Sequence, residues 1–270
     1  MRHYLLIAAL ALFQPVATLL AHPGDEAALG HLDRQLQQQP TAENYLQRAS
    51  IYLRHGDLKQ AEQDIAAAAT LGNTLQVTLL HSELLTLQHQ PNAAIKQLDG
   101  LLQAYPEIPE ALQQRARLLV SVGREQEAAH DYHRLLQAID AQGPGLYLEA
   151  ANVFAKAEGI ELAVAALDAG IKQLGMTVSL QRPAVDYCLQ AGLYQSAIER
   201  QLQLRQVMAE SPLWQLQMAE VYWQAGEIRS AHELLHELDV IAQQRRQSPG
   251  LRAILDRAYK LKEQMLSVQS

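Results

Sequence analysis

Two stretches of the sequence are nearly identical: Gln190–Ala197 has the sequence QAGLYQSA, and Gln224–Ala231 has the sequence QAGEIRSA. A third stretch, Arg54–Ala61, is a variant of the same pattern, RHGDLKQA. Each stretch places a glycine five residues before an alanine. Glycine just past a helix end readily adopts the left-handed conformation that terminates many helices. The three stretches therefore predict a turn between two helices that recurs along the chain.

The alanine of this pattern repeats six times, at separations of 33, 34, 35, 34 and 34 residues. The six positions are Ala61, Ala94, Ala128, Ala163, Ala197 and Ala231. Twelve residues before each alanine there is a small residue or a valine, and nine residues before it there is a larger apolar residue or a cysteine. Small side chains where two helices cross let the helix axes approach closely, and larger ones fill the space between successive pairs.

This period and this pattern resemble the tetratricopeptide repeat family, in which each unit is a pair of antiparallel helices. The resemblance covers about residues 42–245. It implies an all-α fold: a right-handed superhelical solenoid of about six helix pairs, with a capping helix at each end. Because each pair buries little surface alone, stability in such a fold comes from stacking. The family as a whole binds many partners, so the resemblance is specific for the fold and not for the function.

The start of the chain predicts an export signal. Arg2 precedes an apolar stretch that ends at Ala21, where cleavage is expected. An uncleaved membrane anchor is the alternative, but the stretch is short for a span and Pro15 interrupts it. The expected segments are a signal peptide (1–21), an N-terminal segment with a short helix (22–41), the repeats (42–247), and a capping helix with a tail (248–270). The expected product is periplasmic or secreted, without a membrane span after cleavage.

Short helices are expected over residues 27–37 and 251–265, at the two ends of the repeats. The pairs Ser211–Pro212 and Ser248–Pro249 predict helix starts, because serine caps a helix and proline suits its first position. Three departures from the repeat stand out. The turn of the second repeat has His89 to Asn92 in place of a glycine, and Gln201 stands where an apolar residue is expected. Pro183 should make its helix start late, near Arg182, or kink it.

Composition narrows the function classes. The net charge is −7, which gives the chain no reason to seek nucleic acid or an anionic membrane. Cys188 is the only cysteine, so no disulfide can form within the chain. No glycine-rich phosphate loop and no serine–histidine context typical of a catalytic triad are present. We therefore expect no cofactor and no catalytic residues.

One motif favours an enzyme. His232 to His236 has the sequence HELLH, which matches the zinc-peptidase signature in which two histidines bind zinc and the glutamate is the general base. The register places it on the second helix of the sixth repeat, with the histidines beside the buried stripe. A catalytic zinc needs a third protein ligand, and neither Asp256 nor Glu263 is expected to point toward the site. The stretch HDYH, His130 to His133, is a weaker candidate, because Tyr132 occupies the core position.

The resemblance implies that the first helix of each repeat lines a concave face. The strongest inward row is Ser50, Glu83, Arg117, Asn152, Asp186 and Glu220. The residues predicted to contact a partner are Arg54, Glu83, Gln113, Arg117, Glu149, Asn152, Asp186, Gln190, Glu220 and Trp223. This mixed face resembles a protein or peptide groove, and a merely solvated surface is the alternative. Trp223 is either a binding anchor or a residue that packs against the final helix.

One family activity is not implied. Members that bind chaperones clamp a terminal carboxylate with Lys and Asn, whereas the corresponding positions here hold Leu46, Ser50 and Leu80. Three hypotheses remain for the function. The preferred one is a non-catalytic exported scaffold that binds a protein or peptide partner in the cell envelope. The others are a zinc-dependent hydrolase using HELLH and an accessory subunit of an envelope secretion or polysaccharide-export complex.

Overall fold

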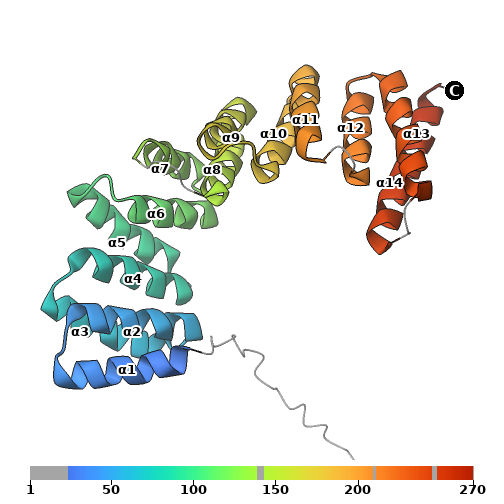
Figure 1. The fold of residues 1–270 in the computed structure, drawn as a ribbon. Helices are drawn as coiled ribbons and strands as arrows, with labels where there is room; N and C mark the ends of the chain where they lie inside the picture. Colours follow the sequence, from blue (N-terminus) through green and yellow to red (C-terminus); the bar gives the residue numbers. More distant parts are fainter. Residues whose placement is uncertain (1–23, 139–142, 209–210, 245–247, 270) are drawn as a thin grey trace, which may run out of the picture. The chain divides into compact units, whose positions relative to one another are not determined.

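The computed structural model describes residues 24–138, 143–208, 211–244 and 248–269. In this part the chain consists of fourteen α-helices without a β-strand (Figure 1). The helices are α1 (Asp25–Gln38), α2 (Ala42–His55), α3 (Leu58–Leu71), α4 (Thr74–Leu87), α5 (Pro91–Ala104), α6 (Pro109–Ser121), α7 (Glu125–Ala138), α8 (Pro144–Ala157), α9 (Ile160–Leu174), α10 (Val178–Gln190), α11 (Tyr194–Met208), α12 (Pro212–Gln224), α13 (Ile228–Gln244) and α14 (Pro249–Gln269). The expected signal peptide lies outside the described residues.

The helices form two compact units, divided after Pro106. In the first unit, α2 pairs with α3 and α4 with α5, and α1 packs on α2. In the second unit the pairs are α6 with α7, α8 with α9, α10 with α11, and α12 with α13, while α14 packs on α12 and α13 (Figure 1). These six pairs are the six repeats that the alanines predict, and the all-α solenoid of helix pairs is confirmed.

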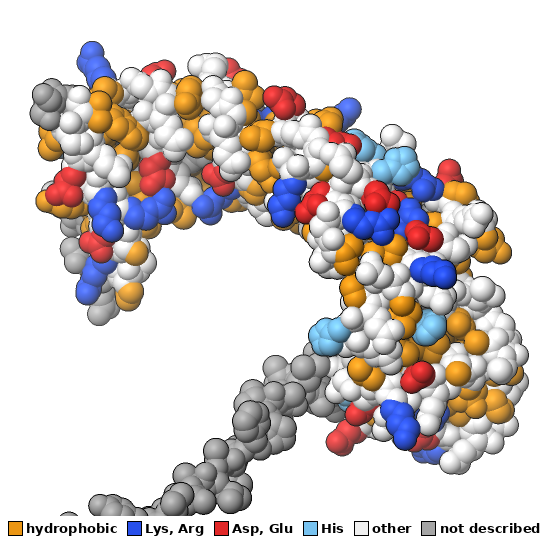
Figure 2. All heavy atoms as spheres, turned by 180° about the vertical axis from the view of Figure 1, so that it is seen from behind, with side chains coloured by type: hydrophobic (Ala, Val, Ile, Leu, Met, Phe, Trp, Pro, Cys, Tyr) orange, Lys and Arg blue, Asp and Glu red, His pale blue; other side chains and the backbone are white. Residues whose placement is uncertain are grey.

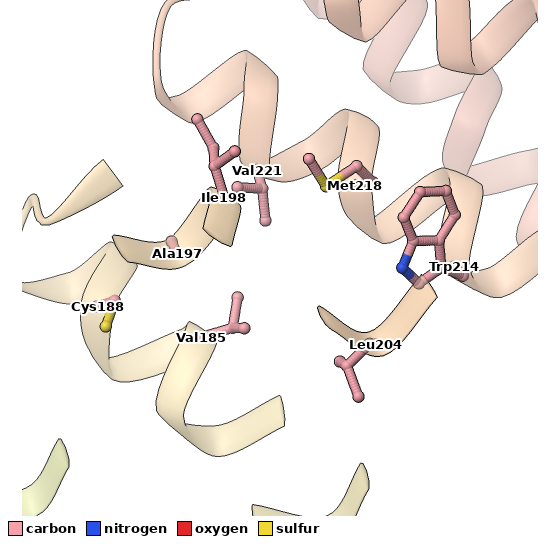
Figure 3. Packing of buried hydrophobic residues seen from close by; sticks show 8 residues of the cluster. All are labelled: Val185, Cys188, Ala197, Ile198, Leu204, Trp214, Met218 and Val221. Carbon is pink, nitrogen blue, oxygen red and sulfur yellow. The ribbon is translucent and has the colours of Figure 1, made fainter. Parts of the chain in front are cut away.

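The repeat positions are buried as the register predicts. All six repeat alanines are fully buried, and the residues twelve positions before them are at most 4% exposed. Figure 3 shows how this packing joins successive repeats: Val185 and Cys188 of α10 and Ala197 of α11 lie in one cluster with Trp214 and other side chains of α12. Stacking of this kind buries the apolar faces that a single pair would leave exposed.

The turns have the geometry that the glycines indicate. At Gly56, φ is 78°, and the N–H of Asp57 donates to the carbonyl of Tyr52 at 2.9 Å. The second repeat makes the same turn without glycine. There His89 has φ 59°, and the N–H of Gln90 donates to the carbonyl of Leu85 at 2.8 Å. A side chain in this left-handed region costs free energy that glycine avoids.

Two local predictions need correction. The helix that contains Pro183 does not start late: α10 begins at Val178 and continues through the proline to Gln190. The alternative, that the proline kinks the helix, stays a prediction. Pro183 is the sixth of the 13 residues of this helix, and its missing N–H removes a single hydrogen bond, to a carbonyl four residues earlier. Ser211 is the N-cap of α12, but only its carbonyl accepts hydrogen bonds from the first turn. Ser248 does cap α14, because its Oγ accepts from the N–H of Leu251 at 3.2 Å.

The two ends of the repeats carry the expected helices. α1 is slightly longer than the predicted helix over residues 27–37, and α14 extends beyond the predicted range of 251–265. Leu251, Ala258, Leu261 and Met265 form the buried stripe of α14, as its amphipathic sequence predicts. Among the described residues, no helix combines the length and the hydropathy that a membrane crossing would require.

Candidate partner-binding surface

The first helices of the repeats in the second unit, α6, α8, α10 and α12, carry most of the predicted contact residues. We call their row of polar side chains the inner row, defined by Arg117, Glu149, Asn152, Asp186 and Glu220. Arg117, Asn152 and Asp186 are exposed, and Glu149 and Glu220 are half-buried. Basic and acidic side chains lie close to one another on the surface in Figure 2, without a large field of one sign.

Glu149 is the centre of a hydrogen-bond cluster between α6 and α8. The Arg117 guanidinium donates to both of its carboxylate oxygens, at 2.9 and 2.7 Å. The Tyr132 hydroxyl donates to it at 3.0 Å, and the Gln113 amide donates at 3.4 Å. Burial alone would raise the pKa of Glu149, but the hydrogen bonds from Arg117 and Tyr132 outweigh burial and lower that pKa. The Glu149 carboxylate and the Arg117 guanidinium therefore have hydrogen-bond partners within the chain.

The inner row continues through α10 and α12. The Tyr187 hydroxyl of α10 donates to Asn152 Oδ1 of α8 at 2.7 Å. Glu220 of α12 pairs with Arg257 of the capping helix α14, with Nη2 2.7 and 2.9 Å from its two carboxylate oxygens. Gln190 is exposed at the end of α10. Asn152 and Glu220 thus link neighbouring helices as well as facing outward.

A polar pocket opens between α10 and α12, with a volume of about 190 Å³. Its lining residues are Arg182, Val185, Asp186, Leu189, Gln201, Gln217, Glu220, Val221, Gln224 and Arg257. Burial raises the pKa of Asp186, and the nearby positive charge of Arg182 opposes only part of this effect. The inner row thus contributes Asp186 and Glu220 to the pocket, and the partial burial of Asp186 is the main cause of its raised pKa.

Trp223 both packs against the final helix and borders an open groove, so it has features of the two roles that the sequence left open. It is half-buried and packs against a cluster of side chains from α12, α13 and α14 that includes Leu235 and Leu261. It also lines an open groove of about 370 Å³ between α12 and α14, beside Lys260. The packing against α14 is part of the structure, while the role as a binding anchor stays a prediction.

In the first unit, the predicted contact residues are Arg54 and Glu83. Arg54 donates to Asp25 of α1 at 2.9 Å, and burial raises the pKa of Glu83 while Arg54 partly opposes it. A groove of about 400 Å³ is lined by Glu43, Leu46, Gln47, Ser50, Asn73, Gln76 and Leu80. The positions that would clamp a carboxylate in chaperone-binding members lie here, and this lining contains no basic side chain.

The HELLH motif lies on the surface of α13. His232, Glu233 and His236 are all exposed, and Glu233 Oε1 accepts from Arg229 one turn earlier, at 3.0 Å. Within the described ranges, no three His, Cys, Asp or Glu side chains are grouped so that they could hold a metal ion. Among these residues the motif therefore has no third ligand.

In the second histidine motif, HDYH, one histidine takes part in packing within the protein. His133 stacks on Phe154 with ring centroids 4.4 Å apart, and its Nε2 is 2.7 Å from a carboxylate oxygen of Glu158. Tyr132 fills the core and is 1% exposed, as its register position predicts. His130 is exposed on α7.

Sequence reasoning did not place four polar residues of the pocket in a site: Arg182, Gln201, Gln217 and Arg257. Gln201 was the available signal, because it is the single polar residue that stands four positions after a repeat alanine where the others are Ile, Leu or Tyr. The contribution of Arg257 has no local signal, since it depends on how the capping helix packs against α12.

Several solved structures resemble the chain. A tetratricopeptide repeat protein from Parabacteroides merdae matches with a TM-score of 0.53 and 16% identity, over 84% of this chain and 92% of its own. Pseudomonas aeruginosa pilF matches with a TM-score of 0.54 and 19% identity, over 73% and 90% of the two chains. The protein MamA matches with a TM-score of 0.52 and 14% identity, over 66% and 100%.

No protein-family model matches the sequence, and no curated protein is significantly similar to it. At these identities the structural similarities concern the fold alone. They agree with the 34-residue register and with the six helix pairs. The chain has the tetratricopeptide-repeat fold.

Proposed function

We propose that the protein is a non-catalytic scaffold that binds a protein or peptide partner through the inner row of its second unit. The observation that carries this proposal is the pocket between α10 and α12, which opens among polar side chains of the inner row. A chain whose helices only needed to stack would gain nothing from a polar cavity at this place. An interface with a polar rim and a few partly buried groups is typical of a specific protein contact.

Site-specific photo-crosslinking tests this proposal. A photoreactive amino acid replaces Asn152 or Gln190, which are exposed on α8 and α10. Matched controls carry it at Gln137 or Lys172, which are exposed on the second helices α7 and α9. We expect the two inner positions to crosslink to the same discrete partner and the two control positions to give no such product. Equal crosslinking from all four positions would contradict the assignment to the inner row.

We further propose that the protein is exported and that its partner is in the cell envelope. The support is the short apolar stretch of residues 4–21, preceded by Arg2 and ended by Ala21. Intact-mass measurement of the protein from the periplasm or the medium tests this, with a chain that begins near His22 as the expected result. A chain that retains Met1 and sediments with membranes would refute it.

A further inference from the structure

Gln201 is a buried amide in a position that the repeat reserves for an apolar side chain. It lies on α11 between Ile198 and Leu204, two members of the cluster in Figure 3, and it is 2% exposed. Its Nε2 has no hydrogen-bond partner among the described residues. A buried donor without an acceptor costs free energy, because it has lost its hydrogen bonds to water. An apolar side chain would avoid that cost.

The backbone fixes Gln201 in this place. Its carbonyl accepts a hydrogen bond at 2.9 Å from the indole nitrogen of Trp214, and Trp214 is itself 2% exposed. This buried hydrogen bond holds the backbone of α11 at Gln201 against α12. Gln201 is also one of the residues that line the pocket between α10 and α12, so a group that enters this pocket lies next to a side chain that lacks an acceptor.

The charged groups of the pocket differ in whether they have a partner of opposite charge or a hydrogen-bond acceptor. Glu220 and Arg257 pair with each other at 2.7 Å. With the Gln217 amide oriented so that its oxygen faces Arg182, that oxygen accepts from Arg182 Nη2 at 2.5 Å. Asp186 has no ion pair within the part of the chain that the structure describes, and burial raises its pKa. The charge that the pocket leaves without a direct partner is therefore a negative one.

We infer that this pocket binds a lysine or arginine side chain of a partner segment, with Asp186 pairing with the cation and the Gln201 amide donating to a carbonyl of the same segment. This inference rests on the proposed scaffold function and names the chemistry of the partner. A volume of about 190 Å³ is smaller than the roughly 300–1,000 Å³ typical of small-molecule sites. It suits one side chain better than a whole ligand. An acidic side chain is disfavoured because Arg182 and Arg257 already have acceptors.

Peptide selection tests the charge of the occupant. Phage-displayed random dodecapeptides are selected on the immobilised protein, and the selected peptides are synthesised and titrated. We expect the selected peptides to share a position that holds Lys or Arg. Their binding should be about tenfold weaker to the Asp186→Asn variant, and about tenfold weaker to the wild type when norleucine replaces that basic residue. Asp256→Asn is the matched control, because Asp256 is an exposed acid on α14 outside the pocket, and it should bind as the wild type does.

The outcomes separate this inference from the scaffold proposal. Peptides without a basic residue, or peptides that bind wild type and Asp186→Asn equally while Asn152 or Gln190 crosslinks to a partner, overturn the inference and leave the scaffold function standing. A protein that selects no peptide and gives no crosslinks overturns both. Binding that depends on Asp186 but not on Asp256 supports the inference.

Gln201→Leu gives a second test, in which stability and binding move in opposite directions. Leucine restores the apolar pattern, so we expect the melting temperature to rise by about 2–6 °C. It also removes the donor, so the affinity for the selected basic peptides should fall by about tenfold. Gln206→Leu, at an exposed position of the same helix, should change neither quantity. A lower melting temperature or an unchanged affinity for Gln201→Leu would overturn the assignment of Gln201.

Discussion

The third and fifth repeats both place polar side chains between their helices, but they differ in whether these side chains have hydrogen-bond partners. In the third repeat, Arg115 of α6 donates to both carboxylate oxygens of Asp131 of α7, at 2.8 and 2.6 Å, and Asp131 is fully buried. In the fifth repeat, the buried amide nitrogen of Gln201 and the buried side-chain oxygen of Gln181 have no hydrogen-bond partner in the part of the chain that the structure describes. The two repeats share the same register of buried alanines.

The difference shows what a polar group in a repeat core can mean. A charge pair with two short hydrogen bonds compensates the loss of hydration and fixes how the two helices meet. The first repeat has the same kind of ion pair: Arg48 and Asp64 occupy the equivalent positions, and Arg48 Nη2 is 2.6 Å from Asp64 Oδ1. An amide without a partner does not stabilise the helix pair in this way, and for Gln201 we assign its role to the pocket that it lines.

The largest effect is expected from breaking the buried pair of the third repeat. Asp131→Ala removes the carboxylate that two nitrogen atoms of Arg115 contact, and it should lower the free energy of unfolding by about 3 kcal/mol. Urea denaturation followed by circular dichroism measures this. The double variant Arg115→Met with Asp131→Leu is the control, and it should cost clearly less than Asp131→Ala. Equal losses would show that the charge pair is not the cause.

The next largest effect tests whether the two repeats pack equally well. Ala128→Leu and Ala197→Leu each force a larger side chain into a helix crossing where the alanine is fully buried, and each should cost about 1–3 kcal/mol. Similar losses, measured by urea denaturation, would mean that the repeats differ in polar satisfaction and not in packing. A much smaller loss for Ala197→Leu would instead mean that the fifth repeat is loosely packed.

The fold was predictable from the sequence because its signals are local and repeated. The glycine turns and the amphipathic final helix each follow from residues close together in the sequence, and the alanine register follows from the same pattern repeated six times. His89 shows the limit of such a signal: the turn forms although its residue is unfavourable there, since the stacked helices on both sides determine the path of the chain. Pro183 is similar, because α10 continues through the proline at the cost of one hydrogen bond.

The candidate site was less predictable because its contacts join residues far apart in the sequence. The positions of Arg117 and Glu149 on the inner row followed from the register, but their mutual pairing did not. The pocket needs Arg257 of the capping helix and the orientation of the Gln201 side chain, and neither is encoded in the repeat pattern. Buried Arg115 and Asp131 were also missed, since a charged pair in a core is recognisable only when both partners are placed.

The smallest effect concerns pH, and it contrasts two carboxylates of the inner row: Glu149 of α8, which pairs with Arg117 of the third repeat, and Asp186 of the fifth repeat. The pKa of Glu149 is lowered in the folded protein, so its contribution to stability is present above the unfolded pKa and is lost as the pH falls through the folded pKa. The pKa of Asp186 is raised, so the folded state binds its proton more tightly than the unfolded chain does. Its charge therefore opposes folding at neutral pH, and this opposition fades as the pH falls through the raised pKa.

Glu149→Gln should accordingly destabilise the protein at pH 7, and the difference from wild type should shrink toward acidic pH. Asp186→Asn should stabilise it slightly at pH 7, and that difference should also shrink as the wild-type carboxylate becomes protonated. Urea denaturation at pH 4, 5, 6 and 7 measures both. If a basic peptide occupies the pocket, the sign for Asp186→Asn should reverse, because a bound cation stabilises the carboxylate. A loss of stability for Asp186→Asn in the free protein would mean that Asp186 has a stabilising partner within the chain. The pocket would then have no unpaired negative charge for a cation to bind.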